Sequence, residues 1–137
     1  TDIFIIHAIN KYICINLNTM VKTKELLDTI VAGIQDKKGS KIVVVDLTKL
    51  NNCICKYFVI CEGTSNTHVN STALSLKDFV KENTKERPLA MEGLENSEWV
   101  VLDYADIMVH VMQREPRHFY DLEHLWADAK ITEIADL

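Results

Sequence analysis

The sequence predicts a single α/β domain in which helices cover a mixed sheet of five strands. Two short runs, residues 42–47 and 57–61, consist largely of β-branched, aliphatic and aromatic residues, which is typical of strands buried on both faces. In other parts of the chain, apolar residues recur every three or four positions, which is the spacing of amphipathic helices. The length of 137 residues suits one domain with its own core.

The first predicted helix is amphipathic and has signals at both ends. Leu26, Ile30 and Ile34 lie on one of its faces. Thr23 is a suitable N-cap residue, and Gly39 lies where a glycine commonly follows the last turn. The expected elements, in order, are a helix over residues 23–38, strands over 42–47 and 57–61, a helix over 69–81, strands over 88–91, 99–103 and 106–112, and a last helix from Pro116.

The last two strands form a predicted β-hairpin, and a helix follows it. The hairpin turn is expected at Tyr104 and Ala105, although tight turns usually have Gly or Asn in place of this alanine. Pro116 suits the first turn of a helix. The spacing along this helix places four residues on one face: Phe119, Leu122, Trp126 and Ala129.

The two faces of the hairpin differ in chemistry. One is uniformly aliphatic and must pack on helices: Val100, Leu102, Ile107, Val109 and Val111. The other, called the mixed hairpin face below, carries large and ionisable side chains: Trp99, Val101, Asp103, Asp106, Met108, His110 and Met112. Trp and Met are enriched in binding surfaces. The pattern alone leaves two interpretations open, a partner-binding surface or a second core covered by a helix.

Composition and charge exclude several classes of protein. The formal net charge is −5, whereas a protein that binds nucleic acid on its own normally has a basic face. We therefore expect no free nucleic acid as a ligand, although a basic protein partner remains suitable. No segment predicts a membrane span or a signal peptide, so a cytoplasmic location is expected. The four cysteines are interpreted as reduced structural thiols, and no metal or cofactor is expected.

Residues 1–19 differ from the rest of the chain in composition. They are rich in Ile and Asn, and the helical pattern begins only after Met20. We interpret residues 1–19 as an upstream extension and residues 20–137 as the domain. The alternative is an additional native strand or helix.

The loop Gly63-Thr64-Ser65 joins a predicted strand to the start of a helix. Backbone N–H groups and hydroxyls in this position can bind an anion. They can equally cap the helix, for which Ser65 is suitable. Asp46, Asp103 and Asp106 could hold a magnesium ion, but Asp46 is isolated on its strand, and the other two are also explained by the mouth of the hairpin.

Several blocks of the sequence resemble one known family. They are VDL at 45–47, YFVICEGTS at 57–65, EG at 92–93, WVVLDYAD at 99–106, VHV at 109–111 and FYDLEHLW at 119–126. In this order they resemble the ribosomal silencing factors, also called RsfS or Iojap-like proteins, over about residues 22–128. Two features depart from the family pattern: Ala105 stands where the family usually has Gly, and residues 1–19 have no counterpart.

The resemblance implies a nucleotidyltransferase-like α/β fold, often as a homodimer, without transferase activity. It also implies binding to a large-subunit ribosomal protein, the fourteenth in the standard numbering, which blocks joining of the small subunit and represses translation. The family's partner-contacting tryptophan corresponds to Trp99. The expected partner-binding residues are therefore Trp99, Val101, Asp103, Tyr104, Met108, His110 and Met112.

An enzyme is the alternative function. A nucleotidyltransferase-like enzyme would hold phosphates at Gly63-Thr64-Ser65 and a metal at Asp103 or Asp106. Such enzymes need two or three carboxylates that converge on a metal pair. The predicted strands contain no Asp-x-Asp pair, so we expect a protein that is not an enzyme.

Overall fold

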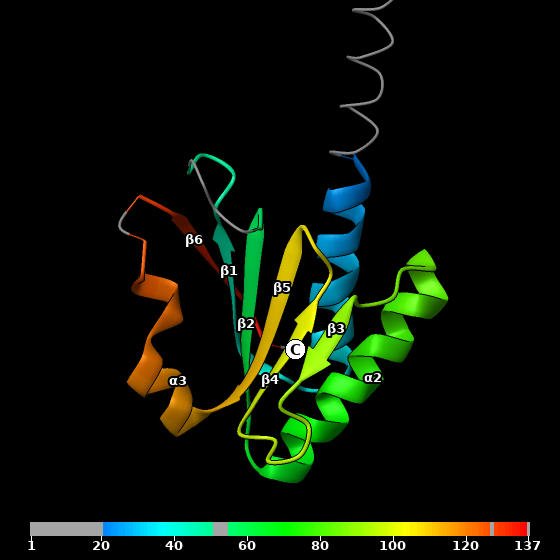
Figure 1. The fold of residues 1–137 in the computed structure, drawn as a ribbon, viewed down its shortest axis with the longest axis vertical. Coiled ribbons are helices and arrows are strands. Elements are labelled where there is room, and N and C mark those ends of the chain that lie inside the picture. Colours follow the sequence, from blue (N-terminus) through cyan, green and yellow to red (C-terminus); the bar gives the residue numbers. More distant parts are fainter. Residues whose placement is uncertain (1–20, 51–54, 127, 137) are drawn as a thin grey trace, which may run out of the picture.

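The computed structural model describes residues 21–50, 55–126 and 128–136. Its centre is a mixed six-stranded sheet with the order β3-β4-β5-β2-β1-β6 (Figure 1). The central pair β2 and β5 is parallel, and all other neighbouring strands are antiparallel. The strands are β1 (Ser40–Asp46), β2 (Tyr57–Gly63), β3 (Ala90–Glu92), β4 (Trp99–Asp103), β5 (Ile107–Gln113) and β6 (Lys130–Ile134).

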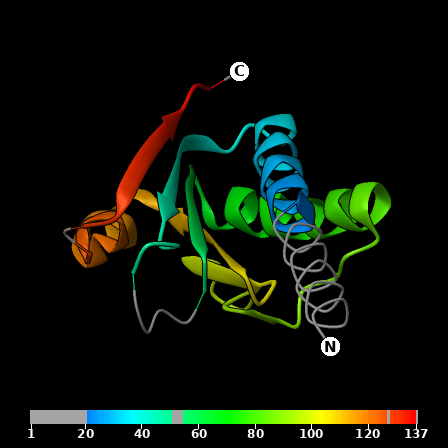
Figure 2. The ribbon, with the colours of Figure 1, turned by 90° about the horizontal axis from the view of Figure 1, so that it is seen from above.

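Helices cover the two sides of the sheet unequally. A helix at residues 21–36 and helix α2 (Asn66–Thr84) lie together on one side (Figures 1 and 2). The short helix α3 (Arg114–Tyr120) and a 3-10 turn at Leu122–His124 lie on the other. Much of the β4–β5 hairpin therefore has no long helix on this second side.

Alternation along the strands divides the apolar residues into two cores. The aliphatic hairpin face joins the core beneath the long helices, and its members Val100, Leu102, Ile107, Val109 and Val111 are fully buried. The second core lies on the opposite side of the sheet and contains Val43, Val45, Phe58, Ile60 and Met112. The structure thus confirms the predicted α/β fold. It also confirms the two predicted faces of the hairpin, which follow from the two-residue alternation of side chains along a strand.

The end of the chain differs from the prediction. The expected last helix ends at Tyr120, because Asp121 adopts a left-handed conformation with φ of 48°. Phe119 is 82% exposed instead of packing on the sheet. After the 3-10 turn the chain adds β6 to the edge of the sheet, which gives six strands instead of five.

Two local expectations are also corrected. Thr23 lies inside the helix at residues 21–36 and is not its N-cap. The hairpin turn is Ala105-Asp106, because Tyr104 N–H donates to the carbonyl of Ile107 and Asp103 pairs with Met108. This shifts the predicted register by two residues, which leaves each side chain on its predicted face.

Two expectations fall outside the described residues. They concern residues 1–19 and Cys53, and both stay predictions. Cys55 and Cys61 are buried. Burial raises the pKa of Cys61 to about 12, so its thiol keeps its proton at neutral pH. In the part of the chain that the structure describes, no helix is both long and apolar enough to cross a bilayer.

Candidate functional site

The mixed hairpin face is partly covered and partly open. Trp99, Val101, Asp103 and Met108 are half-buried. His110 and Met112 are buried, so neither lies on the accessible surface. Leu122 and Trp126 pack against the core that contains Met112. The centre of this face is therefore core and its margin is accessible, and a partner-binding role for that margin stays a prediction.

Tyr104 does not belong to this face. It is buried with Leu102 and Ile107 in the core beneath the long helices. Burial raises the pKa of its hydroxyl to about 12. Its expected role as a partner-binding residue was wrong because the shifted turn makes Tyr104 continue the alternation of β4.

A hydrogen bond fixes the indole of Trp99 on the face. Its Nε1–H donates to Nδ1 of His110 over 3.0 Å. Because an indole nitrogen can only donate, Nδ1 must be the unprotonated nitrogen of a neutral imidazole. Burial lowers the pKa of His110 to about 4, which keeps the ring neutral at physiological pH.

Aromatic rings form a chain from the surface into the second core. Phe119 contacts Tyr120 with ring centroids 5.0 Å apart, and Tyr120 contacts Trp99 at 4.9 Å. From Trp99 the chain continues through His110 and Phe58 to Trp126. The outer end is open, since Phe119 is 82% and Tyr120 50% exposed. Rigid aromatic side chains with an exposed outer end are suited to bind another macromolecule.

The carboxylates at the hairpin tip make contacts within the chain. Asp103 Oδ1 accepts the N–H of Ala105 over 2.8 Å, which holds the turn. Asp106 accepts the hydroxyl of Thr23 and pairs with Lys56 at 3.8 Å. The two carboxylates thus have separate structural partners. Among the described residues, no group of three or more His, Cys, Asp or Glu side chains could hold a metal ion.

The loop Gly63-Thr64-Ser65 serves the helix that follows it. The Ser65 hydroxyl accepts the N–H of His68, which makes Ser65 the N-cap of α2. The N–H of Thr64 donates to Nδ1 of His68 over 2.9 Å. Gly63 approaches Val69 so closely that a Cβ would lie 2.7 Å from its side chain. These contacts support the capping interpretation of the loop.

The two halves of the alternative enzyme site lie far apart. The N–H of Tyr57, where β2 begins, donates to the carbonyl of Asp106, whereas Gly63 ends the same strand. Seven residues of strand span about 20 Å. The predicted phosphate loop and the predicted carboxylates therefore do not form one site.

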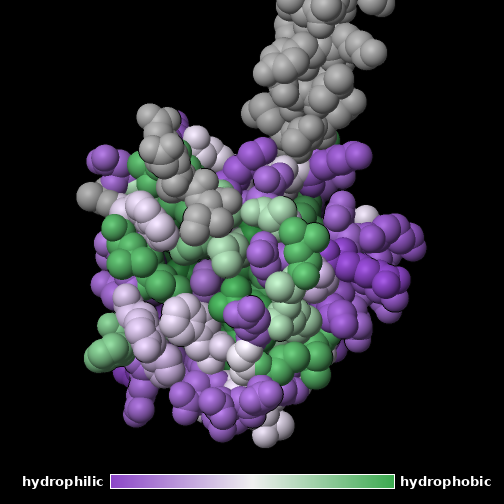
Figure 3. Space-filling model, viewed as in Figure 1, coloured by the Kyte–Doolittle hydropathy of each residue, from purple (hydrophilic) through white to green (hydrophobic). Residues whose placement is uncertain are grey.

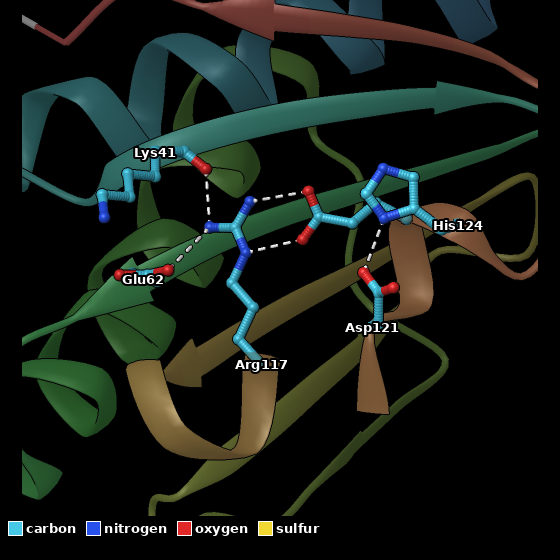
Figure 4. Close-up of polar contacts among 6 residues, drawn as sticks. Lys41, Glu62, Arg117, Asp121 and His124 are labelled. Atoms are coloured by element: carbon cyan, nitrogen blue, oxygen red, sulfur yellow. Dashed lines mark hydrogen bonds and ion pairs between the residues drawn. The ribbon is translucent and has the colours of Figure 1, made fainter. Parts of the chain in front are cut away.

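A second polar cluster surrounds Arg117 beside a cleft of about 520 Å³ (Figure 4). The Arg117 guanidinium binds both oxygens of Glu123 at 2.8 and 3.2 Å. It also donates to the carbonyl of Lys41 at 2.7 Å and lies 3.5 Å from Glu62. Arg117 and Glu62 are both buried. This cluster ties the α3 segment to β1 and β2, and so it holds the exposed aromatic rings in place.

His124 lies at the rim of the same cleft. Its Nδ1 is 2.7 Å from Oδ1 of Asp121, and this contact raises the pKa of His124. The ring is exposed, and its Nδ1 faces the carboxylate of Asp121 (Figure 4).

Sequence reasoning missed the residues that extend the open margin. Phe119 was assigned to a helix face, and Tyr120, Glu98 and Glu115 were not considered as binding residues. Together with Trp99 they line a groove of about 330 Å³. The one available signal was the pair of adjacent aromatic residues close behind Pro116.

The chain is similar to known proteins over most of its length. The family model "Ribosomal silencing factor during starvation" (RsfS) matches residues 20–137. The ribosomal silencing factor RsfS of Bacillus subtilis is 33% identical over 111 residues, which cover 81% of this chain and 92% of that protein. The mouse protein named "Mitochondrial assembly of ribosomal large subunit protein 1" is 32% identical over 58% of this chain and 37% of its own length.

A solved structure has the same fold. It is a crystal structure of a Chromobacterium violaceum protein, with 31% identity and a TM-score of 0.71, and the match covers 82% of this chain and 92% of that chain. Fold and site thus define an α/β domain with an exposed aromatic surface. The chain belongs to the ribosomal silencing factor (RsfS) family.

Proposed function

We propose that the protein acts in the cytoplasm as a non-enzymatic repressor of translation. It binds the fourteenth protein of the large ribosomal subunit on the side that meets the small subunit, and its bulk prevents subunit joining. Membership of the RsfS family supports a role at the ribosome. The printed name of the mouse relative, which refers to assembly of the large subunit, supports that subunit as the partner.

The observation that carries the proposal is the geometry of Trp99. The side chain is half-buried at the margin of the mixed hairpin face, and its N–H is fixed by His110. An aromatic side chain held in one orientation loses little freedom on binding, which makes it a suitable anchor. Val101, Asp103 and Met108 are also half-buried on this face, so they are its remaining candidate contacts.

Charge also supports a basic partner. The chain has 20 acidic and 15 basic residues, which gives the formal net charge of −5. Ribosomal proteins are basic, and opposite charges accelerate encounter and orient the partners. The same charge disfavours direct binding to ribosomal RNA.

Co-sedimentation with purified large subunits tests the proposal. Truncation of an interface anchor costs about 2–4 kcal/mol, so Trp99→Ala should raise the dissociation constant roughly 30- to 700-fold. Leu74→Ala is the matched control, because Leu74 is 41% exposed on α2, on the other side of the sheet. Equal binding by the wild type and Trp99→Ala would contradict the proposal.

Two further measurements complete this test. Urea unfolding of Trp99→Ala separates lost binding from lost folding, since binding is compared only where the variant is folded. Light scattering shows whether the bound species is a monomer or the homodimer that we also propose.

A further inference from the structure

A groove beside the mixed hairpin face combines aromatic rings with carboxylates. It has a volume of about 330 Å³ and lies where β4 begins, β5 ends and α3 follows. Three of its lining residues are aromatic: Trp99, Phe119 and Tyr120. Two are exposed glutamates, Glu98 and Glu115. Figure 3 shows hydrophobic and intermediate residues over α3 and the lower hairpin, with hydrophilic residues around them.

The rings present an unusual amount of exposed aromatic surface. Tyr120 lies between the other two rings, tilted by 43° to Trp99 and nearly perpendicular, at 85°, to Phe119. Phe119 is 82% exposed, although it carries no polar group that water could satisfy. Burial of such a ring contributes favourably to the free energy of binding of any partner that covers it.

The side-chain N–H donors of Trp99 and Gln113 at the groove are already engaged. The Trp99 indole N–H donates to His110. The Gln113 amide nitrogen donates to the carbonyl of Ser97 over 3.2 Å and also to the side chain of Asn66. The groups left to a ligand are the aromatic faces, the Tyr120 hydroxyl and the two carboxylates.

The two formally charged side chains that line the groove are both carboxylates. Aromatic faces carry negative potential and attract cations, and the carboxylates add formal charge. None of the described lining residues is Lys, Arg or His. The basic residue buried in α3, Arg117, is bound by Glu62 and Glu123 away from the groove. A phosphate would be repelled here, and a purely apolar ligand would desolvate two carboxylates without compensation.

We propose that this groove binds an arginine side chain of a basic protein partner. A planar guanidinium can stack on an aromatic face and donate to a carboxylate at the same time, which an ammonium group does less well. The proposal rests on the proposed function, because the large subunit is the source of that partner. It adds a recognition site next to Trp99, formed by Glu98, Glu115 and Phe119.

The first arm of the test uses small probes and the intact protein. N-acetyl-arginine amide is titrated while NMR records the Trp99 indole N–H, which is assigned with Trp99→Phe because the chain has two tryptophans. We expect this resonance to shift, and the shift to be lost in Glu98→Gln and Glu115→Gln. N-acetyl-norleucine amide, which has no charge, should leave the resonance in place. An equal response to both probes would overturn cation recognition.

The second arm measures binding to purified large subunits. Phe119→Leu keeps an apolar side chain but removes the aromatic face, and it should weaken binding about fivefold, whereas Phe119→Tyr should bind as the wild type does. Glu98→Gln and Glu115→Gln should each weaken binding about 3- to 10-fold. Glu95→Gln is the control, because Glu95 is exposed but does not line the groove.

The two arms separate the failure of this inference from the failure of the proposed function. Subunits that bind the wild type and all groove variants equally would overturn the arginine site and leave the proposed function intact. A groove that binds the arginine probe in a protein without affinity for the large subunit would overturn the ribosomal partner and keep the cation site.

Discussion

Trp99 and His110, on the neighbouring strands β4 and β5, are joined by a hydrogen bond in which Trp99 can only be the donor. His110 must therefore remain neutral for the indole to hold its orientation. The other nitrogen of the imidazole, Nε2, is buried and has no hydrogen-bond partner among the described residues. A charged ring in this position would lack both solvation and its present partner. The orientation of the proposed anchor thus depends on the protonation state of a core residue.

This relationship predicts a specific dependence of stability on pH. The pKa of His110 is about 4 in the folded protein and near 6.5 when unfolded, because burial disfavours the charged ring. As pH falls from 6.5 to 4, the unfolded chain takes up the proton first. The free energy of unfolding should therefore decrease by up to about 3 kcal/mol in this window.

The contribution of His110 is isolated by comparison with His110→Asn. The asparagine oxygen can still accept the indole N–H, but the side chain does not titrate. Urea unfolding between pH 4 and 7 should give a flatter profile for this variant than for the wild type. Parallel profiles would show that His110 is not held neutral by the fold.

The two-residue alternation of strands explains why the hairpin faces could be predicted. The turn lies one residue later than expected, yet the pairing shifts by two residues, so no side chain changes face. Tyr104 was misassigned because it was treated as part of the turn, whereas it continues the alternation of β4 into the core. Local pattern therefore determined the faces, and the position of the turn needed the contacts of the whole hairpin.

The end of the chain was not predictable from the same kind of pattern. The spacing from Phe119 to Ala129 suits one helix, but Asp121 in a left-handed conformation ends α3. Leu122, Trp126 and Ala129 do pack on the second core, as the spacing implied, although they do so from separate elements. Strand β6 has no buried residue, so its sequence carried little signal of a strand. The partners of Arg117 at Lys41 and Glu62 are distant in sequence and could be identified only from the structure.

Ala105 is a further testable feature of the hairpin. It has φ of 70°, a conformation that costs a residue with a Cβ about 1–2 kcal/mol. Glycine avoids this cost but has more freedom in the unfolded chain. Ala105→Gly should therefore raise the free energy of unfolding by about 0.5–1 kcal/mol, measured by urea denaturation.

Ala90→Gly is the matched control for the turn. Ala90 is exposed in β3 and is not among the described residues with positive φ. Glycine in a strand lowers stability by about 0.5–1 kcal/mol. If both substitutions destabilise the protein, strain at Ala105 does not contribute to its stability.

The Arg117 cluster predicts a large effect from a single substitution. Arg117→Met leaves Glu62 buried without its cation, and the loss of one partner of a buried ion pair costs about 3–5 kcal/mol. The double variant Arg117→Met with Glu62→Gln should recover part of this loss, because it removes the uncompensated charge. Chemical denaturation of both variants measures the difference. No recovery in the double variant would indicate that Glu62 does not depend on Arg117.

The central claim is that the surface around Trp99 keeps the ribosomal subunits apart. Sucrose-gradient sedimentation of purified small and large subunits measures this directly as the fraction of joined ribosomes. We predict that added wild-type protein lowers this fraction in proportion to its concentration. Folded Trp99→Ala should lower the fraction only at concentrations roughly 30- to 700-fold higher. A wild-type protein that leaves the joined fraction unchanged, or a Trp99→Ala variant that lowers it equally well, would contradict the claim.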